Sequence, residues 1–288
     1  DCESRRGAFY HPQVAFNASG VSLGIVGQQS WTREAISKAS KVDKDNKRKR
    51  LPIEEKESYR WIVGLRAVQA AAQACPETTC VCIGDSEADI FELFVAHADC
   101  QTPNLQVLVR AGQNRNTTEG QDWLDLVRSK PKIGEQTVSI RARTAKVGIG
   151  KSARSKSRDA RTAELEIRKA TIQVCRPVRA LSHLPATISV NVVLCEEVNP
   201  PEGEDAIRWL LVTTLPIDTD EAVQRVIEFY CIRWQIEVFF KTLKSGCRIE
   251  YRRFEAIDRV LNCVALLSVV AWRLMYMCHL GRECPDID

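Results

Sequence analysis

The chain has 288 residues, of which 44% are hydrophobic and 27% are charged. This is enough for one large domain or two smaller ones, and it argues against a mostly disordered protein. The formal net charge is only +4, so charge alone does not indicate a nucleic-acid-binding protein, and any such inference depends on where the cations lie.

The twelve cysteines are scattered along the sequence, and none forms a C-x2-C pair. The closest two are Cys80 and Cys82, which is typical of neither a zinc site nor a small disulfide framework. We therefore expect free, mostly buried thiols in a reducing cytoplasm.

The most apolar stretch of the sequence runs from Val260 to Trp272. Its 13 residues are too few to span a bilayer, and Arg259 and Arg273 flank it. There is no signal peptide at the start of the sequence. We expect a buried helix here and no membrane partner.

The first 110 residues predict alternating strands and helices. Residues 8–31 alternate in polarity and break at "NASG", which predicts a β-hairpin. A polar stretch dense in Lys and Arg follows at 38–58. We then expect a helix at 57–74, a short strand ending in Gly84–Asp85, a helix at 86–98 and a strand at 105–111.

The character of the sequence changes near residue 110. From there to residue 216 the predicted strands are short and separated by turn signals, which predicts an all-β insertion. A cationic loop, Lys151 to Arg161, lies within it. Helices are predicted again at 220–245 and 256–279, the first stopping at Gly246. The organisation is an α/β unit, residues 1–109, split by a β-rich insertion, 110–216, and completed by helices, 217–288.

A narrow polar stripe crosses the first of these helices, in "YCIRWQIEVFFKTLK". At about 100° per residue, Tyr230, Arg233, Glu237 and Lys244 fall within an arc of roughly 60°, with Lys241 at its edge. One interpretation is an exposed face with i,i+4 ion pairs. The other is a metal-binding carboxylate with cations and a phenol arranged for phosphates. The opposite face consists of Ile232, Ile236, Phe239 and Leu243.

Asp85 lies where the predicted strand of "TTCVCIGD" ends. Ligand sites in α/β sheets gather at the carboxyl ends of strands. A carboxylate there and a second carboxylate on a helix are ligands that suit a hard divalent cation. The alternative is that Asp85 only caps the next helix.

Together these segments resemble the DDE transposases of the insertion-sequence-four family, close to the Tn-five type. The family's signature Y-x2-R-x3-E-x6-K is matched in register by Tyr230, Arg233, Glu237 and Lys244. The family's D-R-E-x-D-like stretch corresponds to "GDSEADIF", which aligns Asp85 with the second catalytic aspartate and has Ser86 where Arg is usual. The resemblance covers nearly the whole chain.

The resemblance implies a ribonuclease-H-like core interrupted by the insertion, and two-metal phosphoryl transfer with Mg²⁺ or Mn²⁺. Asp85 and Glu237 would be catalytic and would bind the metal ions. The partner would be double-stranded DNA with terminal inverted repeats, bound by a homodimer in the full-length family, in the cytoplasm of a bacterium at the nucleoid. The DNA-binding residues would be Tyr230, Arg233, Lys244, Trp209 (stacked on a flipped base), Lys151, Arg154, Lys156 and Arg158.

The sequence departs from the family at its start. On the family's pattern the first catalytic aspartate should lie on the strand before the hairpin, roughly 25 to 30 residues ahead of His11. Only ten residues precede His11, and Asp1 is not assigned to catalysis. We expect a chain truncated at its N-terminus and also at its C-terminus. Such a chain would be inactive or impaired alone. The missing first strand would leave the hairpin edge unpaired, which predicts low solubility. The alternative function is that of a non-catalytic DNA-binding remnant.

Overall fold

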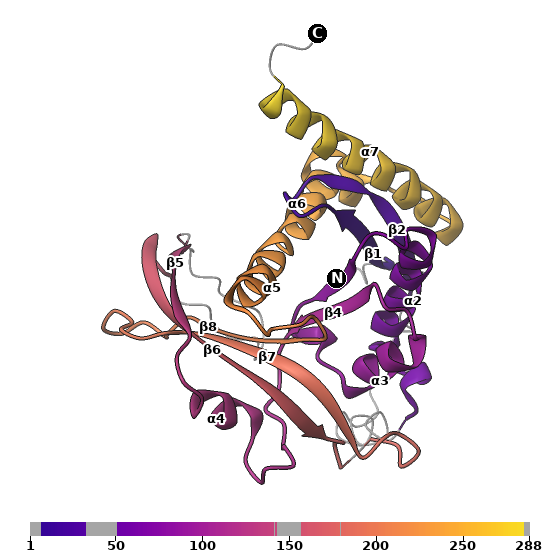
Figure 1. The fold of residues 1–288 in the computed structure, drawn as a ribbon. Helices are drawn as coiled ribbons and strands as arrows, with labels where there is room; N and C mark the ends of the chain where they lie inside the picture. Colours follow the sequence, from indigo (N-terminus) through magenta and orange to yellow (C-terminus); the bar gives the residue numbers. More distant parts are fainter. Residues whose placement is uncertain (1–6, 33–50, 141, 143–156, 179, 285–288) are drawn as a thin grey trace, which may run out of the picture.

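The computed structural model describes residues 7–32, 51–140, 142, 157–178 and 180–284. Within these ranges the chain forms a two-stranded hairpin, a six-stranded sheet and helices on both faces of that sheet (Figure 1). The strands are β1 (Phe9–Phe16), β2 (Ser22–Trp31), β3 (Cys80–Gly84), β4 (Leu105–Arg110), β5 (Gly134–Ile140), β6 (Arg161–Cys175), β7 (Thr187–Glu197) and β8 (Arg208–Thr213). The α-helices are α2 (Tyr59–Ala74), α3 (Phe91–Cys100), α4 (Trp123–Arg128), α5 (Asp220–Ile232), α6 (Gln235–Lys241) and α7 (Ile257–Glu283).

The strands of the large sheet follow the order β3-β4-β8-β7-β6-β5. β3 and β4 are parallel, and the other neighbouring pairs are antiparallel. β4 pairs directly with β8, so the strands of the predicted insertion continue the sheet begun by β3 and β4. A mixed six-stranded sheet with helices on both faces is consistent with the ribonuclease-H-like core implied by the resemblance.

Alternation along the strands creates a hydrophobic core on each face of the sheet. On β4, Val107 and Val109 face α2, α3 and α4, whereas Leu108 faces α5. All three side chains are almost fully buried. The amphipathic pattern of α5 explains its position, because Val226 and Ile227 are buried against the sheet. The sheet is therefore the middle layer of three.

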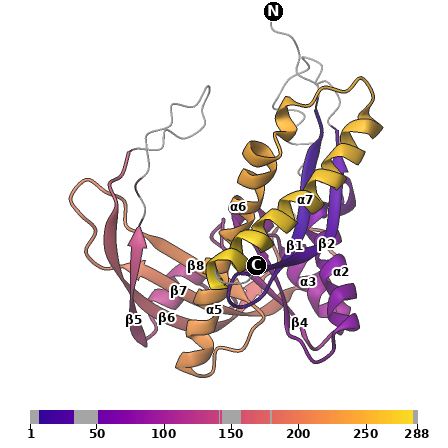
Figure 2. The same cartoon turned by 90° about the horizontal axis from the view of Figure 1, so that it is seen from above.

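The hairpin forms as predicted but lies apart from the large sheet. β1 and β2 are antiparallel and, within the described ranges, pair with no third strand. α2 covers one side of the hairpin, where a Cβ at Gly27 would lie 2.7 Å from the Ala67 Cβ atom. α7 covers another side, where the Trp272 indole N–H donates to the Ser22 carbonyl oxygen at 3.1 Å (Figure 2).

The predicted order of strands and helices up to residue 110 is confirmed, but one helix begins later than predicted and a further helix lies in the stretch after residue 110. The helix expected at 86–98 begins only at Phe91, and Ser86–Ala88 forms a separate 3-10 turn. The stretch interpreted as all-β also contains α4, whose first turn is capped by the Asp122 carboxylate accepting from the Asp125 N–H at 2.9 Å.

The helix predicted as continuous over 220–245 is interrupted. α5 ends at Ile232, α6 begins at Gln235, and a π-helical turn, Thr242–Gly246, follows. Across the junction the hydrogen bonds shorten to the i→i+3 pattern, as in Arg233 N–H to the Tyr230 carbonyl oxygen at 3.2 Å. Arg233 and Trp234 keep helical dihedral angles, so no loop separates α5 from α6.

The prediction that the last helix is buried is wrong. α7 extends over 27 residues and lies along the outside of the molecule above the hairpin (Figure 2). By length and composition alone, α7 could cross a membrane, and only 11% of its most apolar stretch is buried. The buried positions are Ser268 and Ala271, whereas Leu266 and Met277 are 66% and 65% exposed.

The prediction of free thiols is confirmed for the eleven cysteines in the described ranges, none of which is in a disulfide. The expectation that most are buried is wrong, because only Cys195 and Cys247 are fully buried. Burial raises the pKa of the Cys195 thiol to about 12, which keeps it protonated and unreactive at neutral pH.

Candidate active site

Asp85 directly follows β3, at the carboxyl end of the strand. Its Oδ1 atom accepts the Glu87 N–H at 2.8 Å, so the carboxylate caps the 3-10 turn Ser86–Ala88. The capping interpretation is therefore correct for one oxygen. The second oxygen accepts no hydrogen bond from a residue in the described part of the chain, and the side chain is half-buried rather than enclosed. Capping and metal binding are compatible here.

Glu237 lies in the first turn of α6 with its side chain 51% exposed. The nearest cation is Arg233, whose Nη1 atom lies 3.8 Å from the Glu237 Oε1 atom. This is the i,i+4 pair that the surface interpretation predicts. At that distance and exposure it contributes only about 0.5 kcal/mol, and it leaves the carboxylate accessible.

Tyr230, Arg233 and Trp209 form an aromatic and cationic cluster beside Glu237. The Arg233 Cζ atom lies 5.6 Å from the centre of the Tyr230 ring, and the Trp209 ring lies 5.9 Å from the same ring at 58°. The cluster joins the last turn of α5 to β8. Trp209 is half-buried and packs on the core between the sheet and α5.

Two polar atoms of this cluster are buried without a hydrogen-bond partner, the Tyr230 hydroxyl and the Arg233 Nε atom. A buried polar group that makes no hydrogen bond costs about 1–3 kcal/mol. Neither atom is satisfied by a residue in the ranges that the structure describes. Both are donors: Tyr230 lies in the last turn of α5, and Arg233 directly follows that helix.

Lys244 is separated from the other signature residues. It lies in the π-helical turn, and its Nζ atom is 3.3 Å from the Glu250 Oε1 atom, with both side chains more than half exposed. The lysine therefore pairs with a carboxylate outside the stripe. Such an exposed pair is weak, so Lys244 can exchange Glu250 for another anion at little cost.

Three residues of the predicted basic loop, Lys151, Arg154 and Lys156, lie outside the described residues. Arg158 is described and half-buried, and its charge helps to lower the pKa of Glu197. The larger cause of that lowered pKa is Arg161, which forms an ion pair with Glu197. The guanidinium of Arg161 is thus already balanced by a carboxylate.

His11 and Asp89 belong to the surroundings of Asp85, and the sequence interpretation did not include them. The His11 ring contacts Trp61 edge-on, with centroids 4.6 Å apart. The pKa of His11 is lowered to about 4, mainly by burial and also by the charge of Arg60, while Asp85 acts in the opposite direction. The hairpin therefore brings a neutral imidazole within electrostatic range of Asp85. The only sequence signal for Asp89 was its position in "GDSEADIF".

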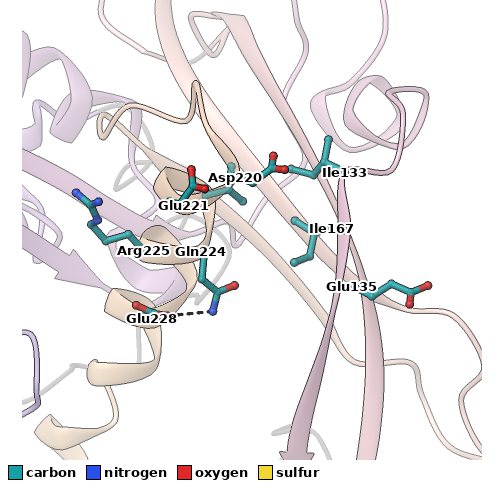
Figure 3. A pocket seen from close by; sticks show the side chains of 10 residues that line it. Ile133, Glu135, Ile167, Asp220, Glu221, Gln224, Arg225 and Glu228 are labelled. Atoms are coloured by element: carbon teal, nitrogen blue, oxygen red, sulfur yellow. Dashed lines mark hydrogen bonds between the residues drawn. The ribbon is translucent and has the colours of Figure 1, made fainter.

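A pocket of about 510 Å³ lies between the start of α5 and strands β5 and β6 (Figure 3). Its lining includes four carboxylates and a single cation, Arg225. Along α5, at the edge of this pocket, Gln224 donates to Glu228 at 3.1 Å (Figure 3). None of the predicted site residues lines this pocket, and its acidic surface is unsuited to phosphates.

No group of three or more His, Cys, Asp or Glu side chains in the described ranges could hold a metal ion. The donor chemistry of Asp85 and Glu237 nevertheless fits Mg²⁺ or Mn²⁺, since both are carboxylates and neither has both oxygens engaged in hydrogen bonds within the described ranges. Mg²⁺ usually binds one or two carboxylates and completes its shell with water and substrate phosphates. The residues present therefore fit part of a metal site.

The described structure thus combines helices on both faces of a mixed sheet with one carboxylate after β3 and another at the start of α6. Comparison with known families identifies the family. The family described as Transposase DDE domain matches residues 66–272, well over half of the chain, and the chain belongs to this family. The family implies DNA transposition and DNA binding, and its members typically use a divalent metal.

Proposed function

We propose that this chain is a transposase of the insertion-sequence-four family, of the Tn-five type. Its reaction would be strand cleavage and strand transfer at the ends of an insertion sequence. The register of the signature supports the finer assignment, and the matched region includes Asp85, Trp209 and the signature residues. The observation that carries the proposal is the pair of unsatisfied buried donors, Tyr230 and Arg233, next to the accessible carboxylate of Glu237.

The protein groups divide the work between the metal ions and the DNA. Asp85 and Glu237 would hold the ions, whose chemistry is to activate water or a 3′ hydroxyl and to stabilise the leaving oxygen. Tyr230 and Arg233 would donate to a backbone phosphate and thereby fix the strand beside Glu237. Lys244 would exchange Glu250 for a second phosphate. Trp209 would stack on a base turned out of the duplex.

The two carboxylates are fewer than the three that give this family its description. Because no cluster of three potential metal ligands occurs in the described ranges, we propose that the chain by itself cleaves DNA poorly or not at all. The same observation supports a second function, DNA binding without cleavage. The Tyr230–Arg233 donors do not depend on the third carboxylate, so binding is expected to survive.

Both functions can be tested with one set of proteins. Wild-type chain, Asp85→Asn and Glu237→Gln are incubated with Mn²⁺ and a duplex carrying the inverted repeats that flank the gene. We expect salt-sensitive binding by all three proteins and no cleavage. Cleavage at the repeat end that disappears in Glu237→Gln and on chelation of Mn²⁺ would contradict the proposed impairment, and failure to bind the duplex would contradict both functions.

The role of the orphaned hydroxyl has its own test. Tyr230→Phe removes a buried group that makes no hydrogen bond in the free protein, so thermal stability should be unchanged or higher. Affinity for the duplex should fall about tenfold, because a hydrogen bond to a charged phosphate is lost. Fluorescence anisotropy measures the affinity. Phe229→Leu, on the neighbouring half-buried position, is the control that alters packing without removing a donor.

A further inference from the structure

Asp89 is a buried carboxylate, only 2% exposed, whose acceptor sites are filled by one arginine and two backbone amides. Its Oδ1 atom accepts from the Arg115 Nε and Nη2 atoms at 3.1 and 2.7 Å. Its Oδ2 atom accepts from the Gly112 and Gln113 N–H groups at 2.8 and 3.0 Å. Arg115 is itself 10% exposed and lies over the Trp123 ring, at 5.6 Å from its centre.

These bonds join two segments that leave the sheet side by side. β3 and β4 are parallel neighbours, with Gly84 opposite Val109, so the residues after each strand leave the same edge of the sheet. Asp89 belongs to the segment after β3, and residues 111–115 follow β4. The bonds from Asp89 thus clamp one segment onto the other.

The clamp presses the second segment directly against the neighbour of Asp85. A Cβ atom added at Gly112 would lie 2.6 Å from the Ser86 carbonyl oxygen and 3.0 Å from the Ser86 Cβ atom. Only glycine fits at this distance. The backbone of Gly112 therefore limits where Ser86, and with it Asp85, can move.

Asp85 has little else to hold it. The turn it caps, Ser86–Ala88, is a single 3-10 turn, and the cap is one hydrogen bond from the Glu87 N–H. One turn of 3-10 helix has weak hydrogen-bond geometry and little stability of its own. The direction of the Asp85 carboxylate therefore depends on what fixes the two ends of the turn, which are the end of β3 and Asp89.

We propose that Asp89 and Arg115 are positioning residues, which hold the Asp85 carboxylate in its metal-binding direction by clamping residues 111–115 onto the turn. The proposal rests on the proposed function of Asp85 and extends it to two residues that touch neither metal nor DNA. A buried ion pair is a poor way to gain stability alone, since apolar side chains of similar size often do as well. Its advantage here is that it fixes the relative position of two backbones.

The test compares Asp89→Asn with a matched control, Glu197→Gln. Glu197 is also buried, at 6% exposed, and also accepts from an arginine, Arg161, and from a backbone amide, that of Ile207. Both substitutions remove the charge from a buried carboxylate that is paired with arginine. A role in stability alone would affect both proteins equally, which urea denaturation measures.

Two local readouts separate positioning from stability. Hydrogen exchange at the Glu87 amide reports whether Asp85 still caps its turn, and Mn²⁺-induced broadening of the resonances around Asp85 reports metal affinity without activity. We expect at least tenfold faster exchange and at least fivefold weaker Mn²⁺ binding in Asp89→Asn, and neither change in Glu197→Gln. Equal changes in both proteins, or none in either, would overturn the proposal.

Two further variants keep the proposal testable if Asp89→Asn does not fold. Gly112→Ala keeps the ion pair but pushes on Ser86, so it should affect exchange and Mn²⁺ binding in the same direction. Asp85→Ala distinguishes failure of the proposed metal-binding role of Asp85 from failure of the positioning role of Asp89 and Arg115. If Asp85→Ala leaves Mn²⁺ binding unchanged, the proposed function of Asp85 is wrong. If Asp85→Ala abolishes binding while Asp89→Asn and Gly112→Ala do not weaken it, the positioning role is wrong.

Discussion

His11 shows how one buried residue ties the hairpin to the candidate site. Its ring packs edge-on against Trp61, and its Nδ1 atom lies 3.0 Å from the Gln13 Nε2 atom. Burial is the main reason why the pKa of His11 falls to about 4, and the charge of Arg60 acts in the same direction. The imidazole is therefore neutral in the folded protein at any pH near neutrality.

This neutral histidine predicts a stability that depends on pH. The unfolded chain protonates His11 near pH 6.5, whereas the folded chain does so only near pH 4. Between these values the unfolded state binds more protons, so the stabilising contribution is complete above about pH 6.5 and is lost as pH falls towards 4. The loss should be about 2–3 kcal/mol.

Urea denaturation from pH 4.5 to 7.5 measures this contribution. His11→Gln retains a polar side chain beside Gln13 but cannot titrate, so the stability difference between wild type and variant should change steadily across this range. A difference that stays constant with pH would contradict a depressed pKa for His11. Other groups that titrate in both proteins cancel in the comparison.

At the residue scale the register of the sequence indicated side chains that are neighbours in space, whereas their role in a site stays a prediction. The register of Tyr230, Arg233 and Glu237 was sufficient to select a cluster that does pack together. Nothing in the sequence indicated that Asp89 meets Arg115, because the two are 26 residues apart and are brought together only by the pairing of β3 with β4. Contacts of that kind depend on the register of strands.

At the scale of elements, periodicity predicted the helices but not where they are interrupted. The stretch from Asp220 to Lys244 has neither Pro nor Gly, so it gives no local signal for the junction at Arg233 and Trp234. The junction has a neighbour in three dimensions instead. The first residue of α6, Gln235, contacts the hairpin turn at Gly20. The hairpin turn thus lies beside the start of the helix that carries Glu237.

The hairpin turn should therefore be sensitive to Gly20→Ala. Gly20 has φ of +80°, and an added Cβ would lie 3.3 Å from the Gln235 Nε2 atom. The strained backbone should lower the free energy of unfolding by about 1–2 kcal/mol. Thermal unfolding measures the loss. Gly134→Ala is the control, because Gly134 has no atom within 4 Å of the new Cβ and no positive φ, and it should change stability by less than about 0.5 kcal/mol.

Gly20→Ala should have a second effect, because Gly20 lies beside Gln235 at the start of α6. If the turn helps to place α6, Gly20→Ala should also weaken binding of the duplex, whereas Gly134→Ala should not. Loss of stability with unchanged DNA binding would show that the contact with Gln235 does not influence the signature helix.

At the scale of the whole molecule, the chain leaves its most apolar helix on the surface. A 13-residue apolar window suggested burial, but α7 buries only one narrow side against the hairpin and α6. The pattern misled because the window is apolar on every face, and such a helix is usually buried in a core or a membrane. The exposed side carries Leu266, Val270 and Met277, which recur at intervals of four and seven residues on one face.

An exposed apolar surface of this size is expected to cause self-association in water. Replacing Leu266 and Met277 together by Lys should reduce association, measured by sedimentation over a range of concentrations. Because both side chains are about two-thirds exposed, stability should change by no more than about 0.5 kcal/mol. The control is Asn262→Lys with Gly281→Lys, which adds the same charge to exposed positions of α7 without removing large apolar side chains. If the control reduces association equally, net charge rather than apolar surface governs it, and the exposed face of α7 is not the cause.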